Sequence, residues 1–474
     1  MSGPRGMKQT RIERDPLGEL PVPADALWGV QTERARNNFP ISNLRPLPAF
    51  VDACIWIKKA AALTHRETGR LDRKLADAII RAADEVLAGG HREHFVVDPY
   101  QAGAGTSHNM NCNEVLANRA NELLGGNRGE YKPVHPNDHV NMAQSTNDVI
   151  PTAIRLAALA QLSPLVAALD RLSGALLAKG EAFDSIVKSG RTHLQDATPV
   201  RLGQEFTAYG HTVERNRDRL TRTADDLRDL GIGGTAVGTG LNAEPEYPPR
   251  MVVHLQAMTS LELRDGSDKV QLMQSMGDAT AFSGALRTYA VDLAKIASDL
   301  RLLASGPRTG LAEIMLPAVQ PGSSIMPGKV NPSIPEMVNQ VCYQVIGNDV
   351  TIAAAAEAGQ LELNVMMPVI AHNLLFSMLI LSNATQVLAQ RCVEGIEADA
   401  AQCAHWLERS PALVTALAPT IGYAEAAKLA KEAVAKNVTV RQLVMEKGLL
   451  KGKELEEVLD LRAMTELGVP GKRK

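Results

Sequence analysis

Long apolar stripes with helical spacing constrain the fold of this chain more than any other feature. One stripe recurs every three or four residues, through Leu162, Leu165, Leu169, Leu172 and Leu176. A second runs from Leu286 to Leu303 and stops at Gly306-Pro307. This spacing places apolar side chains on one face of a helix. Stripes of such length are typical of long helices that pack nearly parallel in a bundle.

A third region, from Met337 to Gln390, is apolar on almost every face of a helix. A helix that is apolar all round must be buried, either between subunits or in the large core of a monomer. Aromatic residues make up only 4% of the chain, and Ala and Leu dominate it, which favours helices over strands. The best strand candidate is the short segment from Phe95 to Tyr100. We therefore predict a mainly all-α fold.

The length of 474 residues suggests about three domains. Loop-rich sequence gives way to long helical patterns near Ser145, and a shorter charged helical segment begins near Glu397. We therefore expect an N-terminal domain at 1–144, a central helical bundle at 145–397 and a small C-terminal helical domain at 398–474.

Charge and hydropathy exclude several classes of protein. The 50 basic and 53 acidic side chains give a net charge of −3 without a charged run, which argues against binding of nucleic acid. We find no apolar run of the roughly 18 residues that a membrane span needs. Met1–Arg14 has no apolar signal-peptide core, and the five scattered cysteines form no C-x-x-C pair. These features predict a cytoplasmic protein.

Four polar segments, each rich in small and hydroxyl residues, precede predicted helices. They span residues 102–109, 144–148, 190–196 and 321–332. After the third, Thr198 is expected to cap a helix that begins at Pro199, and after the fourth, Ser333-x-x-Glu336 predicts a capping box. Each segment alone is explained by a helix cap. Together, several helix N-termini with hydroxyl and amide donors would suit a small dicarboxylate, with charge from Lys329, Arg191 or His193.

The fourth segment is the most informative. Gly322 and Gly328 bracket a stretch too polar for a core and too rich in Pro and Gly for a helix, which predicts a loop able to close over a substrate. Ser323-Ser324 near Lys329 could host an alkoxide. Each pKa unit of lowering requires about 1.4 kcal/mol, and one oriented N–H supplies roughly 3–4 kcal/mol to an oxyanion. Two amides and the lysine would therefore suffice in a closed site.

Other motifs are weaker. Gly231-x-Gly233-x-x-Ala236 matches a dinucleotide fingerprint only superficially, because a charged helical pattern precedes it where a strand is required. His91-x-x-His94 and His135-x-x-Asp138-His139 have metal-like spacing but no third ligand cluster nearby in sequence, so surface polar groups explain them better. We expect no metal site.

The segment Gly322-Ser323-Ser324-Ile325-Met326-Pro327-Gly328-Lys329-Val330-Asn331-Pro332 closely resembles the signature loop of the aspartase/fumarase superfamily. The other three segments match further regions of that family in the same order, and the similarity runs from about Arg11 to about Gly468. The resemblance implies a three-domain, fumarase/aspartase-like homotetramer with a core of long helices. Each active site would combine residues from three subunits.

The resemblance also implies a reversible anti-elimination that yields fumarate, without an organic cofactor. By similarity, Ser323 is the general base, and the doubly charged aci-carboxylate needs preorganised donors. The implied site residues fall into three groups: Thr106, Ser145, Thr146 and Ser324 around the aci-carboxylate; Thr192, His193, Lys329 and Asn331 around the other carboxylate; and Asn147, Ser145 and His193 near the leaving group. His135-Pro136-Asn137-Asp138 resembles a secondary anion site described in fumarases.

Three segments are more similar to aspartases than to class II fumarases. They are Ala104–Asn111, Glu357–Val365 and Pro335–Gln340, whereas Met367 stands where many aspartases have an acidic residue. The chain is therefore expected to be an aspartate ammonia-lyase, with class II fumarate hydratase as the alternative. A non-catalytic helical scaffold would have been favoured by loss of Ser323 or Lys329, and both are present.

Overall fold

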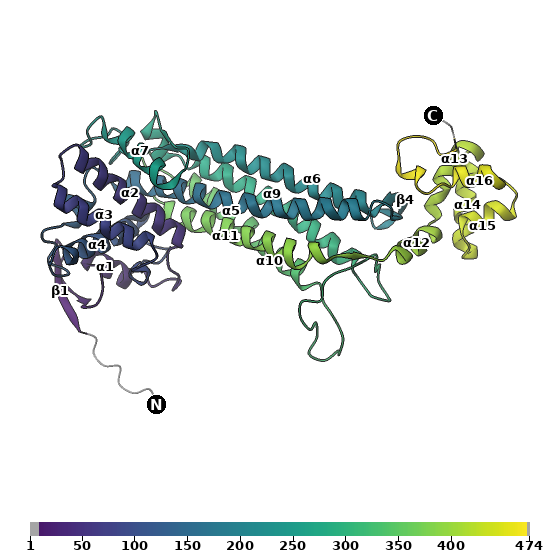
Figure 1. Ribbon diagram of the computed structural model, residues 1–474, viewed down its shortest axis with the longest axis horizontal. Helices are drawn as coiled ribbons and strands as arrows, with labels where there is room; N and C mark the ends of the chain where they lie inside the picture. Colours follow the sequence, from purple (N-terminus) through teal and green to yellow (C-terminus); the bar gives the residue numbers. More distant parts are fainter. Residues whose placement is uncertain (1–8, 472–474) are drawn as a thin grey trace. The chain divides into compact units, whose positions relative to one another are not determined.

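The computed structural model describes residues 9–471, so the first eight residues of the Met1–Arg14 segment lie outside the described part. The fold is mainly helical with a few short two-stranded sheets, which confirms the all-α prediction (Figure 1). The chain divides into two compact units. The first unit contains the chain up to Val166, Asp218–Thr288 and Tyr343–Leu381. The second contains Ala167–Arg217, Tyr289–Cys342 and the chain from Ser382 onward. The three-domain division at 144 and 397 stays a prediction.

The first unit gathers short helices and two small sheets around the start of the longest helix. Its helices are α1 (Val30–Asn38), α2 (Pro48–Glu67), α3 (Arg73–Leu87), α4 (Thr106–Leu123), α7 (Tyr247–Thr259) and α8 (Lys269–Gln274). Its strands are β1 (Thr10–Asp15), paired with β2 (Gly18–Pro23), and β5 (Asp229–Leu230), paired with β6 (Arg264–Asp265). Buried side chains of α2 and α4, such as Ile55, Ile57 and Leu116, form part of its core.

The second unit contains an antiparallel hairpin and a C-terminal group of helices. The hairpin is β3 (Val187–Thr192) with β4 (Gln195–Arg201), and β7 (Ile314–Met315) pairs with β8 (Glu397–Ala398). The C-terminal helices are α12 (Ala400–Arg409), α13 (Val414–Ile421), α14 (Tyr423–Lys436), α15 (Val440–Glu446) and α16 (Gly452–Val458). They enclose their own apolar cluster, which includes Leu407, Leu417 and Leu443.

Long helices contribute to both units, as the apolar stripes predict. They are α5 (Thr146–Ala182), α6 (Leu202–Thr223), α9 (Gly277–Leu303), α10 (Ser333–Glu357) and α11 (Met367–Arg391). Leu165 and Leu172 of the first stripe, and Leu293 of the second, are fully buried. The region from Met337 to Gln390 forms two helices, because the chain turns between α10 and α11.

Two of these helices are more apolar than the sequence analysis expected. By length and hydropathy, α5 and the segment Met367–Gly395 could each cross a membrane. In the most apolar 18-residue stretch of each segment, 61% is buried inside the fold for α5 and 56% for Met367–Gly395. Such burial is typical of the core helices of a bundle. Buried core helices can reach the length and hydropathy of a membrane span without crossing a membrane.

Two expectations about local secondary structure are wrong. Phe95–Tyr100 is not a strand; Phe95 and Val97 are buried there, and Val96 N donates to the side chain of Asn111 rather than to a partner strand. Thr198-Pro199 does not begin a helix but lies within β4, and α6 begins at Leu202. Pro199 stands opposite Ser189 beside a bulge, where a residue without an N–H is tolerated.

The capping box predicted at Ser333 is also absent. Ser333 is the first residue of α10 rather than its cap, and its Oγ is buried without a hydrogen-bond partner. Glu336 N donates instead to Pro332 O at 3.1 Å. The helix therefore begins one residue earlier than the motif requires, with a proline in the cap position.

Candidate active site

The first polar segment forms a tight turn that leads into α4. Ala104 and Gly105 have φ values of 60° and 87°, in the left-handed region. A Cβ on Gly105 would lie 3.0 Å from Cγ1 of Ile150 in α5, so glycine allows the turn to approach that helix. Thr106 is then the first residue of α4, and its side chain is exposed. The turn therefore presents Thr106 beside the start of α5.

The second polar segment caps α5. Ser145 precedes the helix, and its Oγ accepts a hydrogen bond from Asn147 N at 3.2 Å. Asp148 Oδ1 accepts from Ser145 N at 2.9 Å. Thr146 Oγ1 accepts from Asn109 Nδ2 of α4 at 3.2 Å, which joins the first two segments. The start of α5 therefore lies beside the first turn of α4 within the first unit.

Asp148 also joins α5 to a glycine-rich turn. Its Oδ2 accepts hydrogen bonds from Gly233 N and Thr235 N, both at 3.0 Å. Burial raises the pKa of Asp148 to about 6, although these backbone donors oppose the rise. Asn147 Nδ2 donates to Ala236 O of the same turn at 2.8 Å. The Gly231–Gly240 segment is therefore a series of turns that supports α5. The two-residue strand β5 directly precedes it, contrary to the expected helical pattern, but turns rather than a helix follow the glycines.

A buried lysine that the sequence analysis missed holds this region together. Lys58 of α2 is fully buried, and its Nζ donates to three side-chain carbonyls: Asn109 Oδ1 at 2.7 Å, Asn141 Oδ1 at 2.9 Å and Gln144 Oε1 at 2.9 Å. Burial lowers the pKa of Lys58 to about 8. The sequence feature that could have revealed Lys58 is a lysine on the mostly apolar buried face of α2. Lys58 is thus a positioning residue for the chain that leads to Ser145.

The third polar segment forms the tip of the β3–β4 hairpin in the second unit. His193 and Leu194 have φ values of 56° and 58°. Two adjacent left-handed residues match the twist of a two-residue hairpin turn, at a cost of about 1–2 kcal/mol for each non-glycine residue. Thr192 and His193 are exposed there. The hairpin therefore presents both side chains at its end.

Buried charges hold the base of this hairpin. Arg191 Nη1 lies 2.9 and 3.0 Å from the two carboxylate oxygens of Glu313, which is fully buried. Lys188, also buried, pairs with Glu313 at 3.1 Å and with Glu205 at 2.9 Å. Arg191 was a candidate charge for the anion site, but its guanidinium is paired inside the fold. Its role is to position the hairpin that carries His193.

The fourth polar segment is an exposed loop closed by its own hydrogen bonds. Gly322 N donates to Lys329 O at 2.8 Å, and Asn331 Nδ2 donates to Gly322 O at 2.6 Å. A Cβ on Gly322 would lie 2.5 Å from Lys329 O, so only glycine fits this crossing. Ser324 and Lys329 are exposed. Asn331 therefore closes the loop through the same amide that the resemblance assigns to a substrate carboxylate.

The backbone of this loop surrounds the oxygen of Ser323. Ser323 Oγ accepts hydrogen bonds from Met326 N at 2.8 Å and from Ile325 N at 3.2 Å. Two N–H donors that converge on one hydroxyl oxygen stabilise negative charge on it. The geometry is therefore suited to a serine that loses its proton. Ser324 next to it makes the segment distinctive in sequence, but only Ser323 has this pair of donors.

The histidine motifs have local structural roles. His135 Nδ1 accepts from Asn137 N at 3.3 Å and from Asp138 N at 3.2 Å, which caps the π-helical turn Pro136–Val140. His139 Nδ1 accepts from His135 N at 2.9 Å. Near the other motif, Glu93 supplies a third potential ligand group beside His91 and His94. The expectation of no third ligand there is therefore wrong, although His91 is already paired with Glu85 at 2.9 Å.

The candidate site residues thus form groups on separate elements. Thr106 and Ser145–Asn147 lie together in the first unit. The second unit carries Thr192 and His193 on the hairpin, and Ser323, Ser324, Lys329 and Asn331 on the loop. That these groups share one active site stays a prediction.

Comparison with known proteins places the chain among lyases. Residues 18–347 match the family described as Lyase, and residues 413–466 match the family described as Fumarase C C-terminus. An aspartate ammonia-lyase from Bacillus subtilis is 47% identical over 98% of each chain. A class II fumarate hydratase from Halobacterium salinarum is 52% identical over 97% of this chain and 98% of its own.

A solved structure shares the fold. The crystal structure of a fumarate lyase:delta crystallin from Brucella melitensis is 50% identical and superposes with a TM-score of 0.93. The match covers 97% of this chain and all of the other. Sequence and fold therefore agree over nearly the whole length.

Proposed function

This chain is a lyase that belongs to the aspartase/fumarase superfamily, and we propose that it is an aspartate ammonia-lyase. Its reaction would be the reversible elimination of ammonia from L-aspartate to give fumarate. The assignment to a lyase rests on family membership over almost the whole chain. The choice of leaving group rests on a local observation.

That observation is the contact between two segments that resemble aspartases. Ala104 N donates to Val365 O at 2.8 Å, so the turn before Thr106 lies against the end of Glu357–Val365. A Cβ on Gly103 would lie 3.1 Å from Cβ of Val365, which shows how closely the two segments pack. By the family resemblance, both segments are more similar to those of aspartases than to those of class II fumarases. Their contact beside Thr106 supports a joint influence on the leaving group.

The first chemical step is removal of a proton from C3 of aspartate. The alkoxide of Ser323 takes this proton, and the electron pair moves into the neighbouring carboxylate to give the aci-carboxylate. The amides of Ile325 and Met326 stabilise the alkoxide before the transfer. At roughly 3–4 kcal/mol for each donor in a closed site, the two together would lower the serine pKa by several units.

The second step breaks the C–N bond. The electron pair of the aci-carboxylate forms the C2–C3 double bond, and the nitrogen leaves with its own pair as neutral ammonia. Thr106, Ser145, Thr146 and Ser324 would donate hydrogen bonds to the aci-carboxylate. Thr192, His193, Lys329 and Asn331 would bind the other carboxylate, with Asn147 and His193 near the nitrogen. Ammonia needs no strong acid to depart, unlike hydroxide.

Class II fumarate hydratase is the second candidate. The relative from Halobacterium salinarum carries that name and is 52% identical, slightly above the 47% of the Bacillus subtilis aspartate ammonia-lyase. The loop chemistry described for Ser323 would serve either reaction. In the hydratase, the departing hydroxide would require protonation, and His193 is the candidate acid.

We propose a homotetrameric, cytoplasmic enzyme that acts without an organic cofactor. Apolar side chains on α10 support assembly, because Tyr343 and Val350 are 62% and 64% exposed in the isolated chain. By the family resemblance, each active site would combine the loop, the hairpin and the helix ends from three subunits.

The reverse reaction provides a test. The purified protein is incubated with fumarate and ammonium chloride in D₂O, and the products are followed by proton NMR. An ammonia-lyase should give aspartate with a single deuterium at C3. Formation of malate in an ammonium-free sample, without aspartate when ammonium is added, would instead identify a hydratase.

A further inference from the structure

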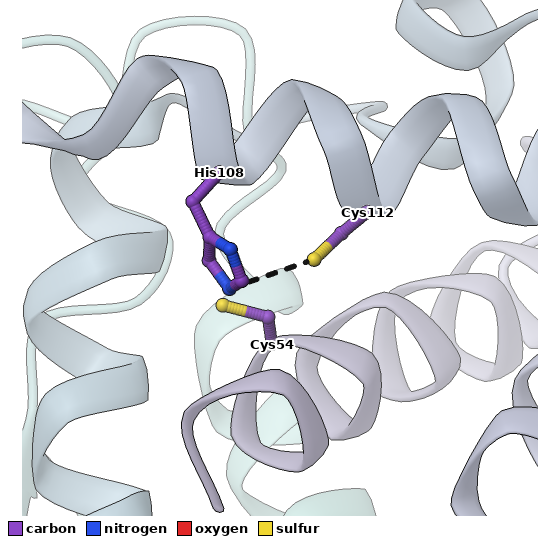
Figure 2. A group of neighbouring side chains, drawn as sticks. All are labelled: Cys54, His108 and Cys112. Atoms are coloured by element: carbon purple, nitrogen blue, oxygen red, sulfur yellow. Dashed lines mark hydrogen bonds between the residues drawn. The ribbon is translucent and has the colours of Figure 1, made fainter. Parts of the chain in front are cut away.

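The packing of α2 against α4 brings together three soft donor side chains outside the candidate active site. Cys54 comes from α2, and His108 and Cys112 come from α4. One ligand atom from each lies within 4.8 Å of the other two. Figure 2 shows the three side chains pointing toward one another between the helices. All three residues are fully buried.

The helical geometry matches a metal site. His108 and Cys112 are four residues apart, so they share one face of α4, and Cys54 faces them from α2. His108 Nε2 lies 3.8 Å from Cys112 Sγ. An ion with bonds of about 2.3 Å to sulfur and about 2.0 Å to nitrogen separates its ligands by about 3.5–4 Å. Small side-chain movements would therefore close the group around one ion.

Hydrogen bonding alone gives little reason for a histidine in this core. The ring of His108 stacks on Phe50, with centroids 4.6 Å apart and an interplanar angle of 15°. Its Nε2 has only the long contact to Cys112 Sγ. Buried polar groups normally have partners. A metal bond to Nε2 would give the ring a strong interaction that offsets its burial.

We propose that Cys54, His108 and Cys112 bind one thiolate-preferring d¹⁰ metal ion, Zn²⁺ or Cu⁺. Zn²⁺ and Cu⁺ bind well to thiolate and imidazole ligands, whereas Mg²⁺ and Ca²⁺ prefer oxygen ligands. Each cysteine that enters as a thiol releases its proton to solvent, and the imidazole binds in its neutral form. Two thiolates neutralise Zn²⁺, and with Cu⁺ they leave one negative charge.

The three ligands are 54 and four residues apart along the chain, which explains why motif spacing did not reveal them. The ion would join α2, which carries Lys58, to α4, which begins at Thr106. Its expected role is structural. The inference does not depend on which substrate the enzyme uses.

Metal titration of the reduced full-length protein tests the site. Bound metals are removed with a chelator under a phosphine reductant, and the protein is titrated with Zn²⁺ or with Cu⁺ in competition with a chromophoric chelator. We expect one ion per chain. Cys54→Ala and Cys112→Ala should each weaken binding on the order of 100-fold or more. Cys392→Ala, which removes a buried cysteine outside the group, should bind as the wild type does.

The separate titrations with Zn²⁺ and Cu⁺ identify the ion. Uptake of one equivalent of Zn²⁺ supports a zinc site, and uptake of Cu⁺ alone supports a copper site. The proposal is overturned if neither ion binds, or if binding is unchanged in both cysteine variants. Circular dichroism verifies folding of each variant. Because the two cysteines lie on different helices, either folded variant is sufficient for the comparison.

Discussion

At the scale of single residues, the proposed reaction depends on how Ser323 becomes a base. Ser323 stands in a loop whose backbone directs two amides at its oxygen, at 2.8 and 3.2 Å. Lys329, also in the loop, can add a positive charge when substrate binds. The proposed alkoxide would thus require the fixed backbone of this loop as well as the serine.

Replacing Ser323 with alanine tests this role. The change should lower kcat by about 10²- to 10⁴-fold, because it removes the base but leaves the fold intact. Steady-state kinetics and a thermal melt measure the two effects. Ser333→Ala is the matched control, because Ser333 Oγ has no hydrogen-bond partner. Substantial activity in Ser323→Ala would mean that another group removes the proton.

Lys58 provides a second test among single residues. Lys58→Met keeps the length of the side chain but removes three hydrogen bonds, including those to Asn141 and Gln144 just before Ser145. We expect kcat/KM to fall about 10-fold or more, because buried carbonyls lose their donor. The neighbouring Lys59→Met, which loses only a partly exposed pair with Asp84, should retain activity. Equal kinetics for both variants would refute the positioning role.

At the scale of elements, the sequence predicts long helices well and the contacts between them poorly. The stripes ending at Leu176 and Leu303 predicted α5 and α9, because period and length are local properties. The β3–β4 hairpin was missed because Thr198-Pro199 has the local pattern of a helix cap, whereas pairing with β3 decides its structure. Loop residues such as Ser323 were found from a distinctive motif. Lys58 and the Cys54 group were missed because their partners come from other segments.

Asp148 predicts a pH dependence at the start of α5. Its pKa is about 6 in the folded chain against 3.8 ordinarily, so between these pH values the folded chain keeps a proton that the unfolded chain loses. Ionisation of Asp148 therefore lowers the free energy of unfolding as pH rises from about 4 to above 6, by at most about 3 kcal/mol. The melting temperature of the wild type minus that of Asp148→Asn should fall between pH 4 and 6. A constant difference would contradict the buried, protonated carboxyl.

At the scale of the whole molecule, the prediction concerns assembly. Val350 on α10 and Val434 on α14 are 64% and 66% exposed in the isolated chain. If α10 lies between subunits, Val350→Asp places a charge in an apolar interface and should give smaller species in analytical ultracentrifugation, with loss of activity. Val434→Asp should sediment and react like the wild type. Unchanged sedimentation of Val350→Asp would exclude this part of α10 from the interface.

The leaving group can be identified from the substrate that the protein converts to fumarate. The ultraviolet absorbance of fumarate is followed after the purified protein is mixed with L-aspartate and, separately, with L-malate. We predict that absorbance rises with L-aspartate and not with L-malate. A rise with L-malate alone would refute the proposed ammonia-lyase and identify a fumarate hydratase that uses the same loop.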